Sequence, residues 1–372
     1  FNIQMPTHVA ISSKGVIAAN EQSYGKVKLW TQPYTYNGQP SDVVLGKFSN
    51  TFCDAQVMVA DYYLTSCDGI AFSPDGNKIL ASDSYNNRIL IWNTIPTTNG
   101  KAADVVIGQV NFTTNSAGTS STKLRYPTAL YVTPDGRLIV SDRNNNRILI
   151  WNTIPTTNGK AADVVLGQVD FNSNEAGTSS SKLKSPWGFY MSPDGKLFVA
   201  DTNNDRVMVW NSIPTTNGQP ADIVIGQADF NTVTPGTSST LMNKPSGVTV
   251  SPTGRLVVGE FANNRALVYN SIPTTNGQPA DVVLGQADFS TSTYYHPNGF
   301  IDNKNMAEIY NAAFDLYGRL FVVGRFMDRA LIFGTTPTQQ SNIGISVTTS
   351  NTNPCKNSRI KLTFTLTNHG TQ

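Results

Sequence analysis

Short apolar runs separated by turn residues recur along the chain, and this pattern predicts an all-β protein. In one copy of the pattern, residues 186–191, 196–200, 206–210 and 222–226 are each rich in aliphatic and aromatic residues. The turn Ser192–Gly195 separates the first two runs, because its proline presets φ and its glycine accepts a positive φ. We therefore expect four short antiparallel strands in each copy.

The copies recur with a nearly constant period, so the repeat determines the fold class. The aromatic residues that close the third run of each copy are Trp30, Trp92, Trp151, Trp210, Tyr269 and Phe333. The third and fourth runs are almost continuously apolar, so both faces of each sheet must be covered. Four-stranded sheets stacked around an axis provide this cover. We predict a six-bladed β-propeller over residues 1–341, in preference to a linear solenoid.

Three motifs of the repeat resemble those of the NHL-repeat family of β-propellers. They are Pro-x-Gly before the first strand, Pro-Asp-Gly in the first turn, and Asp-x-x-Asn-(Asn/Asp)-Arg before the third strand, as at Asp142–Arg147. The resemblance covers about Pro6 to Phe333, and it is specific because the repeat itself recurs sixfold. It implies a propeller fold. The family includes protein-interaction modules, RNA-binding propellers, and relatives with lyase or lactonase chemistry, so fold alone assigns no function.

An acidic residue precedes the third strand in most copies. A basic residue lies five positions after this acid. A charged functional ring is one interpretation of this recurrence. Because an active site is not sixfold symmetric, we interpret the recurring residues as structural ion pairs. The four best-matched pairs are Asp83 and Arg88, Asp142 and Arg147, Asp201 and Arg206, and Glu260 and Arg265.

In a propeller, the innermost strands converge on a central channel, where binding residues are expected. Aligning the copies places Thr7, His8, Asp68, Thr128, Trp187, Ser246, Tyr310 and Asn311 there. Calcium needs six to eight oxygen ligands and a catalytic zinc about three protein ligands, which this set does not provide. We therefore expect no catalytic residues, no metal and no cofactor. Trp187 and Tyr310, with Tyr126 and Trp92 elsewhere in the chain, could stack on a sugar or a peptide, with simple packing as the alternative.

The composition narrows the classes of partner. Charged residues make up 14% of the chain, against about 25% in an average globular protein. The formal net charge is +2 without a run of basic residues, which argues against nucleic acid. No apolar stretch approaches the roughly 20 residues that span a bilayer, which argues against membrane insertion. Asn, Thr, Ser and Gly fill the polar positions, which favours an extracellular or cell-surface location.

Two covalent features are predicted. Cys53 and Cys67 lie 14 positions apart across one loop, and we expect a disulfide between them, with two free thiols as the alternative. Asn111 begins an Asn-Phe-Thr sequon and is a candidate glycosylation site. A single sequon is near chance in so Asn- and Thr-rich a chain.

The last residues, 342–372, differ from the repeat and contain two strand-like segments of alternating polarity. The second segment resembles the beginning of bacterial Ig-like surface modules, although a complete sandwich needs about 100 residues. Ile345 follows Phe333 by the same 12 positions that separate Asp281 from Tyr269. The first segment is therefore expected to be the outer strand of the last blade, the beginning of an Ig-like module, or both.

These observations favour a non-catalytic extracellular propeller. It would act as a binding or scaffold module, or as a structural subunit of a cell-surface assembly such as a filament. The expected partner is a protein, a glycan, or further copies of the chain. The competing hypothesis is a metal-dependent hydrolase or lyase that uses the axial channel.

Overall fold

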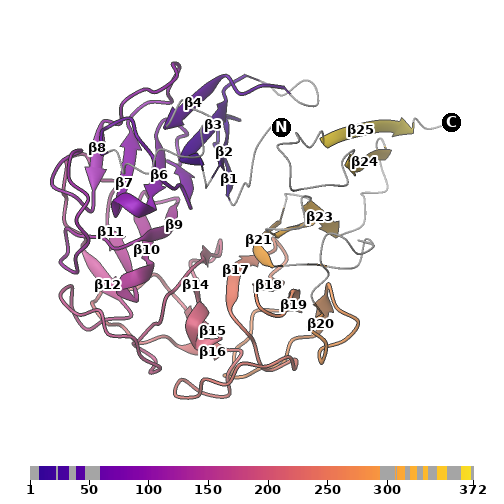
Figure 1. Ribbon diagram of the computed structural model, residues 1–372. Helices are drawn as coiled ribbons and strands as arrows, with labels where there is room; N and C mark the ends of the chain where they lie inside the picture. Colours follow the sequence, from indigo (N-terminus) through magenta and orange to yellow (C-terminus); the bar gives the residue numbers. More distant parts are fainter. Residues whose placement is uncertain are drawn as a thin grey trace.

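The computed structural model describes residues 8–21, 24–32, 39–46, 59–293, 306, 308–314, 319–324, 330–333, 342–349 and 362–369. Within these residues the sheets follow one another around a central axis (Figure 1). Five sheets have four antiparallel strands and a sixth has three. The structure thus confirms the predicted all-β, six-bladed propeller followed by a short C-terminal β segment.

The five four-stranded sheets share one strand order, with the first strand nearest the axis. The first contains β1 (Val9–Ile11), β2 (Ile17–Glu21), β3 (Lys26–Trp30) and β4 (Val43–Gly46). The second contains β5 (Ile70–Phe72), β6 (Ile79–Asp83), β7 (Arg88–Trp92) and β8 (Val105–Ile107). The third contains β9 (Pro127–Val132), β10 (Leu138–Asp142), β11 (Arg147–Trp151) and β12 (Val164–Leu166). The fourth contains β13 (Phe189–Met191), β14 (Leu197–Asp201), β15 (Arg206–Trp210) and β16 (Ile223–Ile225). The fifth contains β17 (Pro245–Val250), β18 (Leu256–Glu260), β19 (Arg265–Tyr269) and β20 (Val282–Leu284).

Short 3-10 helices connect the second and third strands of three sheets: η2 (Ser84–Asn86), η3 (Arg143–Asn145) and η4 (Thr202–Asn204). A left-handed residue follows each helix, for example Asn146 with φ of 54°. Asn and Asp tolerate this conformation. The Asn146 side chain also accepts a hydrogen bond from the backbone N–H of Ser185, at 2.8 Å, and so ties the third sheet to the fourth.

The core lies between neighbouring sheets. One cluster joins the first sheet to the second, and further clusters join the second to the third, the third to the fourth, and the fourth to the fifth. The strand-closing tryptophans are fully buried, and the indole of Trp151 donates to the Lys160 carbonyl at 3.0 Å. Near the axis, a Cβ atom on Gly188 would lie 2.3 Å from the Ser246 carbonyl oxygen. This close approach explains the glycine of the Pro-x-Gly motif.

The Asn-Gly loops at the rim connect each sheet to the one before it. Asn158 Oδ1 accepts the N–H of Val106 at 3.0 Å, and the N–H of Gly159 donates to the Val106 carbonyl at 2.9 Å. The same pair of bonds recurs at three further junctions, from the loops of Asn99, Asn217 and Asn276 to the outer strands β4, β12 and β16. These loops therefore cover strand edges that would otherwise be exposed.

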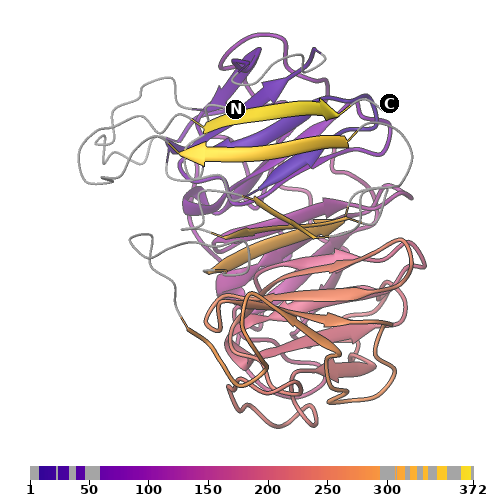
Figure 2. The ribbon, with the colours of Figure 1, turned by 90° about the vertical axis from the view of Figure 1, so that its right-hand side faces the viewer.

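The C-terminal region differs from one expectation. The sixth sheet contains β21 (Ile309–Phe314), β22 (Leu320–Gly324) and β23 (Ala330–Phe333). The first C-terminal segment is β24 (Asn342–Thr349), and it pairs with β25 (Leu362–His369) over eight positions instead of pairing with β23. The local hairpin provides more backbone pairs than the three that join β7 to β8. Figure 2 shows this two-stranded sheet in yellow, separate from the sixth sheet.

No helix among the described residues is long and apolar enough to cross a membrane.

The rim bonds predict a specific loss of stability. Replacing Asn158 by Ala removes the acceptor for the Val106 N–H, so the free energy of unfolding should fall by about 1 kcal/mol. Urea unfolding followed by tryptophan fluorescence measures the change. Thr157→Ala, in the same exposed loop, is the control and should change stability by less than about 0.5 kcal/mol. Equal effects of the two substitutions would contradict the role of the Asn-Gly loop.

Candidate binding site at the axial end of the propeller

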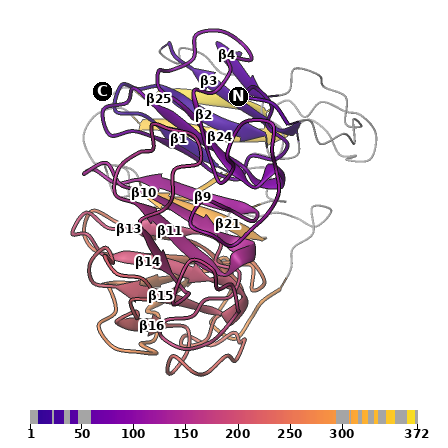
Figure 3. The same cartoon turned by 90° about the vertical axis from the view of Figure 1, so that its left-hand side faces the viewer.

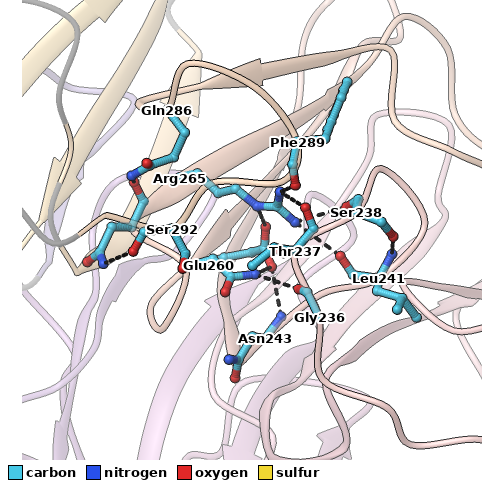
Figure 4. A network of polar contacts seen from close by, with 12 residues as sticks. Gly236, Thr237, Ser238, Leu241, Asn243, Glu260, Arg265, Gln286, Phe289 and Ser292 are labelled. Atoms are coloured by element: carbon cyan, nitrogen blue, oxygen red, sulfur yellow. Dashed lines mark hydrogen bonds and ion pairs between the residues drawn. The ribbon is translucent and has the colours of Figure 1, made fainter.

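The predicted acid and arginine pairs form buried networks around the long loops. In the fifth sheet, Arg265 Nε donates to Glu260 Oε2 at 2.5 Å, and both side chains are fully buried (Figure 4). The other guanidinium nitrogens donate to four backbone carbonyls, those of Thr237, Ser238, Leu241 and Phe289. Glu260 also accepts from the Asn263 amide and from the Asn243 N–H. The pair thus holds the loops before and after its own sheet.

The same arrangement recurs in the other predicted pairs. Arg88, Arg147 and Arg206 each bind the acid five positions earlier, at 2.7 to 2.8 Å. Burial raises the pKa of Asp201 to about 6 and that of Glu260 to about 7, while the arginine charge and the donated hydrogen bonds oppose the rise. The carboxylates are therefore engaged by structural donors on several sides.

The predicted axial residues have different surroundings. Thr128 Oγ1 donates to the Trp187 carbonyl at 3.2 Å, and Ser246 Oγ donates to the Ile309 carbonyl at 2.5 Å. Both hydroxyls therefore tie one blade to the next. Thr7 lies outside the described residues, and Tyr310 and Asn311 lie in β21 with side chains outside what is described.

The two ionisable axial residues are His8 and Asp68. Burial lowers the pKa of His8 to about 4, although a hydrogen bond to the backbone of Ile70 opposes the change. Its imidazole is therefore neutral at pH 7. The backbone N–H of Asp68 donates to Ser82 Oγ at 3.0 Å, and its carboxylate lies near enough to Tyr126 to raise the pKa of that phenol.

A cluster of aromatic rings and one guanidinium lies at this axial end. Arg143 Cζ is 4.2 Å from the centroid of the Trp187 ring and 5.8 Å from that of Tyr126. Tyr126 makes an edge contact with Tyr85, whose ring centroid is 5.4 Å away. Tyr85 is 60% exposed, while the other three side chains are partly buried. Desolvation, chiefly, raises the pKa of Tyr126, so this phenol stays neutral. We call Tyr85, Tyr126, Arg143 and Trp187 the axial cluster.

Arg143 occupies a position that the second and fourth blades use for a hydroxyl. Ser84 and Thr202, its equivalents in the second and fourth sheets, donate to the carbonyls of Pro127 and Pro245 in the next blade. In the third sheet, Ser141 provides this bond instead and donates to the Pro186 carbonyl at 2.8 Å. The inter-blade bond is retained, so the side chain at position 143 is not required for it.

Three exposed basic residues lie where the chain enters neighbouring inner strands: Arg125, Lys184 and Lys244. Burial raises the pKa of Asp205, and the charges of Lys244 and Lys184 both oppose the rise, so the two ammonium groups lie near one carboxylate. A guanidinium on aromatic faces suits a ligand that offers both a flat apolar face and an acidic group.

Sequence reasoning named Trp187 and Tyr126 as aromatic residues that could stack on a ligand, but it did not identify Arg143 or Tyr85. The available signal was the departure of position 143 from its repeat equivalents Ser84 and Thr202. The contact to Trp187 depends on how the third and fourth sheets stack, which the alignment of copies does not contain.

The predicted disulfide is not present. Cys67 is a free thiol, fully buried in the cluster between the first and second sheets, and its Sγ lies 3.4 Å from the Gly69 carbonyl oxygen. Burial raises the pKa of this thiol well above its usual value. Cys67 instead packs between two sheets, and the spacing of the cysteines along the chain does not contain this position. Cys53 lies outside the described residues.

Asn111 has a local structural role in addition to its sequon. Its exposed side-chain oxygen accepts the N–H of Thr113 at 3.0 Å. Asp170, Asp229 and Asp288 make the equivalent turn in later copies. Glycosylation of Asn111 stays a prediction. Among the described residues, no group of three or more His, Cys, Asp and Glu side chains is placed to hold a metal ion.

Comparisons with known proteins match the repeat. The family model of the NHL repeat matches residues 124–151, and that of the WD domain, G-beta repeat, matches residues 60–93. The chain is similar to a solved structure described as "Streptogramin B lyase structure", at 14% identity and a TM-score of 0.49, over 86% of this chain and 76% of that chain. No curated protein matches.

These findings define the class of protein. The chain is a β-propeller with repeats of the NHL type, as the motifs predicted. The resemblance of its C-terminal segment to an Ig-like module stays a prediction.

The buried networks predict a large effect for one substitution. Arg206→Met leaves Asp201 buried without its cation and removes donors from several loop carbonyls. The free energy of unfolding should therefore fall by about 3 to 5 kcal/mol, as measured in urea. Lys196→Met breaks the partly exposed pair with Asp194 and should cost less than about 1 kcal/mol. Similar losses in the two variants would show that burial adds nothing to the Arg206 pair.

The lowered pKa of His8 predicts a pH dependence. The folded state keeps His8 neutral down to about pH 4, whereas the unfolded chain protonates it near pH 6.5. Its contribution to stability is therefore complete above pH 6.5 and is lost as the pH falls towards 4. The variant His8→Gln keeps an N–H donor without titrating. The wild type should lose more of its unfolding free energy than this variant over that interval, and parallel curves would contradict the prediction.

Proposed function

We propose that this chain is a non-catalytic extracellular propeller, a binding or scaffold module of the cell surface, and that the axial cluster binds an acidic carbohydrate. The observation that carries the proposal is the stacking of the Arg143 guanidinium on the Trp187 ring at a partly exposed axial position. It is supported by Ser141, which makes the inter-blade bond that Ser84 and Thr202 make from the equivalent of position 143 in the second and fourth sheets.

The chemistry of the cluster favours an acidic sugar. Aromatic faces bind the C–H faces of sugar rings, and an arginine fork binds a carboxylate through two parallel hydrogen bonds. The exposed cations Arg125, Lys184 and Lys244 lie where the chain enters the inner strands of the third, fourth and fifth sheets. A chain of uronic acids offers both features at each sugar unit.

The assignment as a binding protein rests on how the repeated acids are used. Asp83, Asp142, Asp201 and Glu260 each bind a buried arginine and a side-chain amide, and each holds a long loop in place. This structural role accounts for their recurrence without chemistry at a substrate. A protein partner, or further copies of the chain, would use the same scaffold for a surface assembly.

Binding of polygalacturonate tests the proposal. The wild type should bind this acidic polymer, and should bind its fully methyl-esterified, neutral form at least about tenfold more weakly, in isothermal titration calorimetry. Trp187→Ala removes the ring face, and Arg143→Ala removes the guanidinium. Each should weaken binding at least about tenfold. Lys160→Ala, which removes an exposed charge from a rim loop, is the control and should leave the affinity unchanged.

Three outcomes would overturn the proposal. Equal affinity for the acidic and neutral polymers would remove the role of the carboxylate. Full binding by both cluster variants would place the ligand elsewhere. Cleavage of the polymer, seen as new reducing ends or as unsaturated products, with loss of activity on chelation, would favour the metal-dependent hydrolase or lyase.

A further inference from the structure

The first sheet exposes two residues at positions that are buried in the second, third and fifth sheets. Val9 is 54% exposed and Ile11 is 68% exposed. Their equivalents in the second sheet, Ile70 and Phe72, are 2% and 9% exposed and belong to the cluster shared with the first sheet. The equivalence follows from the strand register, since Val9 pairs with Ala19 as Ile70 pairs with Ala81.

The same two positions are also buried deeper in the ring. Leu130 and Val132 in the third sheet contact the second, and Val248 and Val250 in the fifth sheet contact the fourth. This face of each sheet therefore packs on the preceding sheet. The first sheet has no preceding sheet in the chain, so its face, which we call the Val9 face (Val9, Ile11 and Ile17), needs a cover from elsewhere.

The C-terminal hairpin has one apolar face. In its register, Ile345 pairs with Leu366, and Val347 pairs with Phe364. Because these pairs are two positions apart, their four residues share one face of the two-stranded sheet. The intervening pair, Ser346 with Thr365, and the flanking pairs place Ser, Thr and Gly on the other face. An isolated two-stranded hairpin is marginally stable in water, so this apolar face also needs a partner.

The hairpin lies where the Val9 face needs its cover. Figure 1 places β24 and β25 in the arc between the sixth sheet and the first. Figures 2 and 3 show the hairpin at the same height as the first sheet, and Figure 1 shows the gap between them. The hairpin therefore faces the first sheet across the open junction of the ring, where Val9 and Ile11 stay exposed in this structure.

We propose that the apolar face of the β24–β25 hairpin, formed by Ile345, Val347, Phe364 and Leu366, packs on the Val9 face of the first sheet. This contact joins the two ends of the propeller and closes the junction between the sixth and first sheets. It is independent of the ligand at the axial cluster.

Thiol labelling tests this contact. The parent carries Cys53→Ser and Cys355→Ser, and retains Cys67, which is fully buried. Ile11→Cys is added, and the rate at which a maleimide reacts at position 11 is measured in the full chain. Thr157→Cys, in an exposed rim loop, provides the rate for an uncovered site in the same parent. The thiol at position 11 should react at least about tenfold more slowly than the thiol at position 157.

Charges on the two faces of the hairpin provide the matched comparison. Phe364→Asp places a carboxylate on the apolar face and should raise the labelling rate at position 11 by about tenfold. Thr365→Asp places the same charge on the opposite face and should leave the rate unchanged. Near-ultraviolet circular dichroism of the buried tryptophans checks that both variants stay folded. If Phe364→Asp unfolds the chain, Ile345→Asp replaces it.

Three results of these labelling experiments would overturn the proposal. Labelling of position 11 as fast as position 157 would mean that the Val9 face is uncovered. Protection that survives both Phe364→Asp and Ile345→Asp would assign the cover to the sixth sheet. Protection that is lost on dilution, together with a dimer mass in light scattering, would assign it to the hairpin of a second copy.

Discussion

A guanidinium that is fully buried must have its donors satisfied, and the propeller loops are arranged around this requirement. Arg147 binds Asp142 and donates to loop carbonyls both before β9 and after β12. Leaving such a charge without partners costs several kcal/mol, so the loops are fixed in one arrangement. The long connections at the axial end can therefore present side chains from a rigid base, although they lack regular structure of their own.

Polar residues of the repeat also join one blade to the next. The left-handed Asn146, the rim residue Asn158 and the hydroxyl of Ser141 each bond to the backbone of a neighbouring sheet. Much of the Asn, Thr and Ser content is therefore explained by contacts between blades. This finding weakens the step from composition to an extracellular location, because the same residues are required by the fold in any compartment.

The sequence predicted the features that repeat, and it failed where the structure depends on position across the ring. The period, the strand-closing Trp151 and the Arg206 pair follow from residues that lie close together in the chain. Cys67 was assigned a disulfide from spacing alone, but its place between two sheets was not contained in that spacing. The pairing of β24 with β25 was missed because the blade register favoured β23 equally well. The contact of Arg143 with Trp187 crosses between blades and needs the sheets to be stacked first.

A residue that departs from its repeat can be interpreted when the structural role of its equivalents in other blades is known. The equivalents of Arg143 in the second and fourth sheets, Ser84 and Thr202, donate a hydrogen bond to a proline carbonyl of the next blade. In the third sheet Ser141 makes this bond instead. The ring therefore retains its inter-blade bond while a guanidinium is placed beside Trp187. The inter-blade bond does not require that arginine, and the proposed acidic ligand would give its guanidinium a role.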